Sequence, residues 1–175
     1  MKKSLLLIAL LTTAFTAFAA VDDSHFKWSL WGDEASAFPN NNLRNVRGLD
    51  LGIGSKTDRM KGVQLDLVWG ETDYILRGAS FGGMVNIANR ISGFQTAAYV
   101  QANEVHGMQL GGVNFARSLD GVQAGFYNQA DEVVYGLQIG IVNQAYHMEQ
   151  GCQIGLVNIA HNGFWPVMIL MNGRF

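Results

Sequence analysis

Charged residues are scarce in this sequence, and their scarcity narrows the class of protein. Only 15% of the 175 residues are Asp, Glu, Lys or Arg, whereas about 25% is usual in a soluble domain. The formal net charge is −2, so no basic surface for nucleic acid is expected. A wall that faces lipid is one explanation of a surface with so little charge.

Cysteine and proline are also rare, and a long apolar run is missing beyond the N-terminus. Cys152 is the single cysteine, which excludes an intramolecular disulfide. The longest later apolar run, residues 164–171, is interrupted by Pro166, so no transmembrane helix is expected. With 21 glycines, 2 prolines and many Val, Ile, Phe and Tyr residues, the composition favours β-structure.

The N-terminal residues have the three-part layout of a secretory signal peptide. Lys2 and Lys3 precede an uncharged apolar stretch, and the segment ends in Ala17-Phe18-Ala19. We therefore predict a signal peptide over residues 1–19 and a single β-repeat domain over residues 20–175. The protein is expected to be exported.

A repeat of 14–16 residues fills most of the remaining chain, approximately residues 48–160. Its consensus is Gly-x-Gln-x-Gly-x-x-Asn-x-Ala, and the copies at 136–145 and 151–160 match it closely. Such self-similarity indicates one structural unit per copy. The eight copies begin at Gly48, Gly62, Gly78, Gly93, Gly107, Gly121, Gly136 and Gly151.

Each copy has the alternation of a β-strand. In the copy at 136–145, Leu137, Ile139 and Ile141 alternate with polar or small residues, as in a strand whose successive side chains face opposite sides. Four to six turn residues would follow each strand. Flanking strands near 26–30 and over 166–175 bring the expected total to about ten.

Two all-β architectures fit this pattern. We favour a closed or nearly closed antiparallel meander or barrel, because strands of this length with one apolar face suit a membrane and the chain ends in Phe175. The alternative is a parallel β-solenoid. The uniformity of the copies supports the solenoid, as does an aliphatic residue three positions after most motif alanines. These residues are Ile91, Val105, Leu119, Val133 and Met148.

The repeated motif resembles a family of bacterial surface-exposed repeat proteins. The resemblance rests on Gly-Leu-Gln-Ile-Gly-Ile-Val-Asn at 136–143 and Gly-Cys-Gln-Ile-Gly-Leu-Val-Asn at 151–158. It implies an exported protein without catalytic residues. Some members are lipoproteins, but this chain lacks the cysteine that such anchoring requires.

The recurring amides are the main candidate functional residues. We interpret them as structural ladders in which amides bond to one another; a polar track that binds a ligand is the alternative. The set comprises Gln64, Gln95, Gln109, Gln123, Gln138, Gln153, Asn86, Asn114, Asn128, Asn143 and Asn158.

No catalytic, metal or cofactor site is predicted. Cys152 occupies a motif position that is apolar in the other copies, which favours a small hydrophobic role over a nucleophile. We expect a non-enzymatic protein of the outer membrane or cell surface with a structural or interaction role. Its partner would be outer-membrane lipid or another envelope component. The alternative is a soluble periplasmic or secreted binding module that presents a repeated Gln/Asn face.

Overall fold

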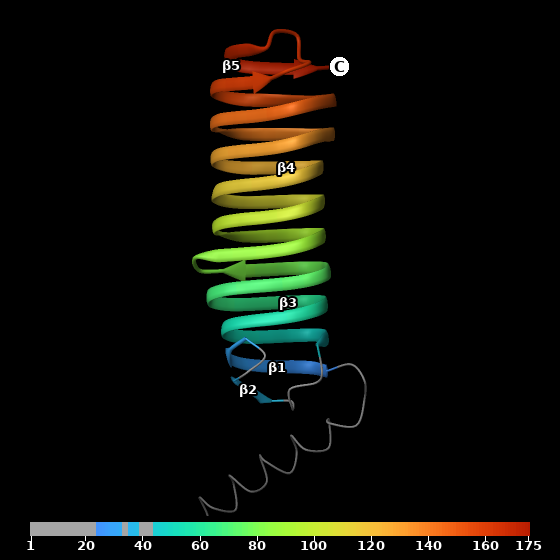
Figure 1. Ribbon diagram of the computed structural model, residues 1–175, viewed down its shortest axis with the longest axis vertical. Helices are drawn as coiled ribbons and strands as arrows, with labels where there is room; N and C mark the ends of the chain where they lie inside the picture. Colours follow the sequence, from blue (N-terminus) through green and yellow to red (C-terminus); the bar gives the residue numbers. More distant parts are fainter. Residues whose placement is uncertain (1–23, 33–34, 39–43) are drawn as a thin grey trace, which may run out of the picture.

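The computed structural model describes residues 24–32, 35–38 and 44–175, and this part of the chain is almost entirely β-structure (Figure 1). The strands are β1 (Ser24–Trp31), β2 (Ala35–Phe38), β3 (Asn45–Gly82), β4 (Val85–Ala160) and β5 (Val167–Arg174). The all-β prediction is therefore confirmed. The predicted signal peptide, residues 1–19, lies outside the described residues.

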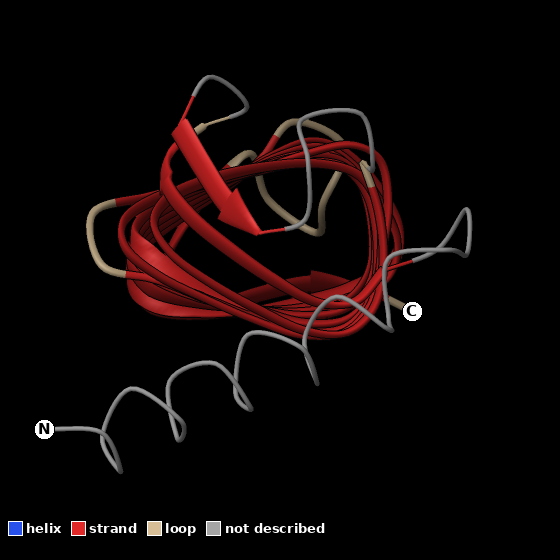
Figure 2. Cartoon of the chain, turned by 90° about the horizontal axis from the view of Figure 1, so that it is seen from below, coloured by secondary structure: helices blue, strands red, loops and turns tan. Residues whose placement is uncertain are grey.

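The lengths of β3 and β4 reflect a chain that winds around one axis, with one repeat in each coil (Figures 1 and 2). Where β3 meets β4 the pairing is parallel, and Gly78 lies beside Gly93 as Ala79 lies beside Phe94. Equivalent motif positions therefore stack in columns along the axis, at the spacing of about 4.8 Å between neighbouring strands.

The favoured closed antiparallel barrel of about ten strands is wrong, because the repeats stack in parallel rather than turning back on one another. The residues expected in solvent-facing turns continue as strand around the coil instead. The aliphatic residue in each of these segments points inward and is at most 1% exposed. In the parallel coil these aliphatic side chains are removed from water, which stabilises the fold. In hairpin loops of a barrel the same side chains would face water. The column comprises Val46, Met60, Leu76, Ile91, Val105, Leu119, Val133 and Met148.

Antiparallel strands close both ends of the coil. At the N-terminal end β2 pairs with β1, which itself lies parallel to β3. At the C-terminal end β5 pairs antiparallel with the last coil of β4, so that Cys152 lies beside Gly173. These caps cover strand edges that would otherwise invite pairing with other chains. β5 falls within the strand predicted over residues 166–175.

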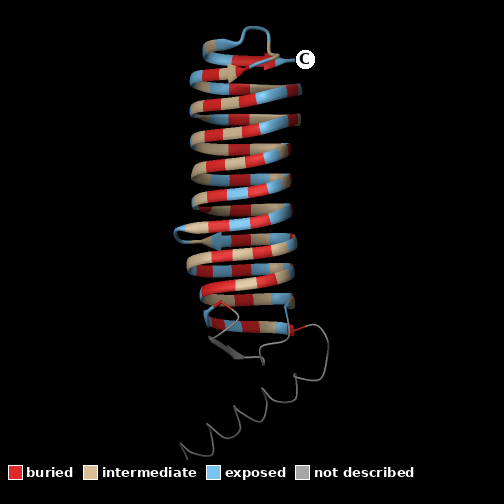
Figure 3. Cartoon of the chain, in the orientation of Figure 1, coloured by how far each residue is buried: buried red, intermediate tan, exposed pale blue. Residues whose placement is uncertain are grey.

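Buried and exposed residues alternate along the coil, as Figure 3 shows. The inward positions divide into an apolar part and a polar part. The apolar part is the aliphatic column together with the motif alanines, such as Ala130 and Ala145, which are 0% exposed. The polar part consists of the motif amides, and it is described below.

Glycine at the first motif position is required by the path of the backbone. Gly107 has a φ of +142°, which L-residues rarely adopt. A Cβ atom there would lie 2.1 Å from the carbonyl oxygen of Gly93 in the preceding coil. The first motif glycine has a positive φ in each of the first six copies, which explains why glycine is found at this position.

Candidate functional site

The six motif glutamines occupy one inward column, and the five from Gln95 to Gln153 form a hydrogen-bonded ladder. Nε2 of Gln123 donates to Oε1 of Gln109 at 2.9 Å, and Nε2 of Gln138 donates to Oε1 of Gln123 at 2.8 Å. Gln153 continues the series to Gln138 at 2.7 Å. Each of these amides also donates across the interior to a backbone carbonyl, as Gln138 does to Gln144 at 3.3 Å. The ladder therefore ties successive coils together and joins opposite walls of each coil.

A second ladder of asparagines runs beside the first with the opposite direction of donation. Nδ2 of Asn114 donates to Oδ1 of Asn128, Asn128 donates to Asn143, and Asn143 donates to Asn158, each at 2.8 Å. The glutamines donate toward the N-terminal end and the asparagines toward the C-terminal end. The two rows of amide dipoles thus oppose each other inside the coil.

The ladders weaken toward the N-terminal end, where the motif is less regular. Val100 takes the asparagine position in one copy, and Oδ1 of Asn114 in the next coil has no hydrogen-bond partner. Gln95 bonds instead across to Asn86 at 2.8 Å, and Gln64 accepts from Ser80 at 3.3 Å. All eleven predicted amides are buried, and none is more than 2% exposed.

This burial decides what the amides can do. A side chain enclosed in the interior cannot be presented to a partner, so these motif amides do not form the exposed Gln/Asn face that the alternative hypothesis required. Most of the amide groups bond to one another and to the backbone, and their role in this geometry is to hold the coils in register.

The outer surface of the coil has few charged residues, and a wall that faces lipid was the explanation offered above for this scarcity. From Gly78 onward, the motif segments contain no Asp, Glu, Lys or Arg. The charged residues of this region before the last motif all lie in the short segments between motifs. They are Arg90, Glu104, Arg117, Asp120, Asp131, Glu132 and Glu149.

Large apolar side chains occupy the outward positions of these uncharged motifs. We call this surface the apolar wall. Phe126 is 70% exposed and Leu156 is 59% exposed. A shallow depression of about 570 Å³ crosses the wall, bordered by residues that include Phe126, Ile139 and Gly125. The wall comprises Met108, Leu110, Phe126, Ile139, Ile141, Ile154 and Leu156.

The segments between motifs form a separate charged edge. Nε of Arg90 lies 2.6 Å from Oε2 of Glu104, and Nδ1 of His106 lies 3.3 Å from Oδ2 of Asp120. Because these pairs join adjacent coils in solvent, each contributes little to stability. Their main effect is on the character of the surface, which is polar along this edge and apolar along the wall.

Comparison with protein-family models, curated proteins and solved structures finds no match to this chain. The resemblance to surface-exposed repeat proteins therefore stays an expectation. No helix among the described residues is long and apolar enough to cross a membrane.

The described residues contain no group of three or more His, Cys, Asp or Glu side chains that could hold a metal ion. Cys152 is half-buried, and burial raises the pKa of its thiol above the ordinary value. A raised pKa disfavours the thiolate, which is the reactive form of cysteine. This agrees with the interpretation of Cys152 as a small apolar residue.

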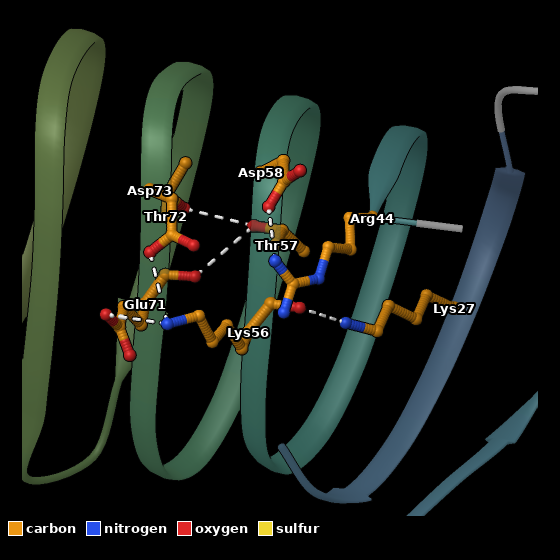
Figure 4. Close-up of polar contacts among 8 residues, drawn as sticks. All are labelled: Lys27, Arg44, Lys56, Thr57, Asp58, Glu71, Thr72 and Asp73. Carbon is orange, nitrogen blue, oxygen red and sulfur yellow. Dashed lines mark hydrogen bonds and ion pairs between the residues drawn. The ribbon is translucent and has the colours of Figure 1, made fainter. Parts of the chain in front are cut away.

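Charged side chains gather around the first coils, as Figure 4 shows. Nζ of Lys56 lies 3.2 Å from Oε1 of Glu71 and 3.3 Å from Oδ1 of Asp73. The hydroxyls of Thr57 and Thr72 are 3.2 Å apart in the column that later copies fill with alanine. The early copies thus replace the later amide and alanine columns with more varied polar contacts.

Sequence reasoning missed a buried ionisable group in the same coils. Asp50 stands where later copies have the motif Gln, and Asp66 stands where they have the second motif Gly. Lys27 of β1 pairs in register with Asp50. A search for departures from the consensus at inward positions would have found both aspartates, because the structure leaves them 0% and 5% exposed.

Proposed function

We propose that this protein is a non-enzymatic component of the cell envelope, a rigid β-solenoid that attaches to envelope lipid through its apolar wall. The observation that carries the proposal is the run of six successive motif segments without a charged residue, the last four of which expose the large apolar side chains of the wall. Contiguous apolar surface of this kind is uncommon on soluble monomers and marks contact with a membrane or a protein.

The dimensions and energies of the wall suit a membrane surface. The residues of the wall lie on four stacked coils, which at about 4.8 Å between neighbours give a strip on the order of 15 Å long. Burying a half-exposed Leu, Ile or Phe side chain contributes about 1 kcal/mol. Several such side chains would provide stable yet reversible attachment, and the amide ladders would keep the strip straight.

The expected export of the chain supports this location. A signal peptide over residues 1–19 would deliver the protein across the inner membrane, and the outer membrane or cell surface would supply the lipid. The second candidate is a soluble periplasmic or secreted binding module. In that case a protein partner would cover the same apolar wall, since the Gln and Asn side chains are enclosed.

Flotation with phosphatidylcholine vesicles tests the proposal. The protein would be purified after export, and the wall variant would carry Phe126→Asp and Leu156→Asp. The matched control, Ser92→Asp with Gln150→Asp, adds the same charge at exposed positions between motifs. We expect the parent protein and the control to float with the vesicles and the wall variant to remain unbound. A folded parent protein that does not bind, or a wall variant that binds equally well, would overturn the proposal.

A further inference from the structure

Three ionisable side chains lie inside the N-terminal coils, where later coils have only neutral groups. Lys27, Asp50 and Asp66 are 3%, 0% and 5% exposed. Lys27 and Asp50 belong to the column that becomes the Gln ladder, and Asp66 belongs to the adjacent glycine column. Buried charges require partners, because desolvation of an isolated charge is costly.

The two carboxyl groups differ in how well they are bonded. Oδ2 of Asp50 accepts a hydrogen bond from Oγ of Ser55 at 2.5 Å. Oδ1 of Asp50 and both carboxyl oxygens of Asp66 have no hydrogen-bond partner. Asp66 is thus the less compensated of the two in its charged form.

Glycines on either side make room for the carboxyl group of Asp66. A Cβ atom on Gly52 would lie 2.7 Å from Oδ1 of Asp66, and one on Gly70 would lie 2.4 Å from Oδ2. The carboxyl group therefore occupies a space between two glycines, and the side-chain amide of Gln64 lies nearby. Such a setting favours the neutral acid over the carboxylate.

The charges that face Asp66 reinforce this preference. From β1 comes the ammonium of Lys27, and from the preceding coil comes the carboxyl group of Asp50. On the other side, the equivalent columns of the following coil hold Ser80 and Gly82, which are uncharged. Burial and the neighbouring Asp50 raise the pKa of Asp66 to about 8, although Lys27 and the side-chain amide of Gln64 act in the opposite direction. Burial also raises the pKa of Asp50, which Lys27 and Ser55 counter.

We propose that Asp66, enclosed with Asp50 and Lys27 in the first coils, is a proton-operated latch for the N-terminal end of the solenoid. While Asp66 carries a proton, the buried charges of this group are those of Lys27 and Asp50, and the coils stay closed. When Asp66 loses the proton, two buried carboxylates share the buried ammonium of Lys27, and the coils open to hydrate the additional negative charge.

The direction of the pH dependence follows from the two states of the chain. In the opened coils Asp66 has an ordinary pKa near 4, and in the closed coils its pKa is about 8. Between these values the closed form binds one proton more, so closure weakens as the pH rises. The opening equilibrium should rise by up to about tenfold per pH unit across this window and level off above pH 8. Coils of a solenoid can open locally, because each contacts only its neighbours.

Hydrogen exchange measured by mass spectrometry tests the latch in the full chain. Peptides from residues 46–70 report the N-terminal coils, and peptides from residues 121–158 in the same molecule serve as the internal reference. After correction for the intrinsic pH dependence of exchange, opening of residues 46–70 in the parent protein should increase between pH 6 and pH 8. Opening of the reference coils should not change.

Asp66→Asn should remove the increase, and Asp66→Gly, which restores the consensus residue, should do the same. Having two neutral variants keeps the test valid if one does not fold. Asp131→Asn, at an exposed position, should behave as the parent. Equal opening of residues 46–70 at pH 6 and pH 8 in the parent protein would overturn the proposal, as would an unchanged pH dependence in the folded Asp66 variants.

Discussion

Replacement of Gln123 by leucine should show how much the amide ladder contributes to stability. Nε2 of Gln123 donates to Gln109 at 2.9 Å and to the carbonyl of Gln129 at 3.2 Å, and its Oε1 accepts from Gln138 at 2.8 Å. Leucine fills a similar volume but leaves Oε1 of Gln109 and one N–H of Gln138 without partners. Each buried group so orphaned costs about 1–3 kcal/mol.

The two orphaned groups together cost about 2–6 kcal/mol, and the apolar burial of leucine offsets about 1–2 kcal/mol. We therefore expect Gln123→Leu to lower the free energy of unfolding by about 1–4 kcal/mol, a large share of the usual 5–15 kcal/mol. Urea unfolding followed by far-UV circular dichroism measures this change. The control is Gln150→Leu, at an exposed position, which should alter stability by less than about 0.5 kcal/mol.

The double variant Gln109→Leu with Gln123→Leu gives a sharper readout, because it removes both members of one ladder bond. The loss in free energy of unfolding should be smaller than the sum of the two single losses. When both residues are replaced, the bond between them leaves no unpaired amide group behind. Equal stability of Gln123→Leu and Gln150→Leu would refute the reasoning. It would mean that the buried amides find other partners or water.

Two further substitutions test the packing of the coil. Gly107→Ala should destabilise the protein by about 2 kcal/mol or more. Alanine tolerates the positive φ poorly, and its Cβ would lie 2.1 Å from the carbonyl oxygen of Gly93. A thermal unfolding midpoint equal to that of the parent would contradict the described backbone conformation. Leu119→Ala should cost about 2–5 kcal/mol by leaving a cavity in the aliphatic column, and a loss below about 1 kcal/mol in chemical unfolding would show that the column is loosely packed.

Much of the local structure could be predicted from the sequence. The repeat located the coils, and alternation around Gln138 and Gln153 assigned those side chains to one side of a strand. Strand direction could not be predicted in the same way, because alternation is a local property that parallel and antiparallel neighbours share. The decisive observation lay in the segments between motifs, where Leu119 and Met148 are fully buried.

The apolar side of the strands could be predicted from the sequence, whereas the buried carboxyl groups could not. Residues such as Ile139 and Phe126 were assigned to the apolar side of a strand, and the solenoid leaves that side exposed. The burial of Asp50 and Asp66 was not predicted. An aspartate in a weak copy of a motif is expected at the surface unless the residues that stack on it in the neighbouring coils are known. Only stacking in register places Asp50 beneath a ladder of glutamines.

The amide ladders and the apolar wall both depend on the parallel stacking of the repeats, which pairs of spin labels on neighbouring coils can test. Leu137 and the native Cys152 share one outward motif position in successive coils, whereas Gln144 lies across the interior from Gln138. Labels on Leu137→Cys and Cys152 should sit about 5 Å apart at the backbone and show strong spin–spin broadening, and labels on Gln144→Cys and Cys152 should show much less. Strong broadening for the 144–152 pair with little for 137–152 is what an antiparallel hairpin would produce, and it would contradict the solenoid.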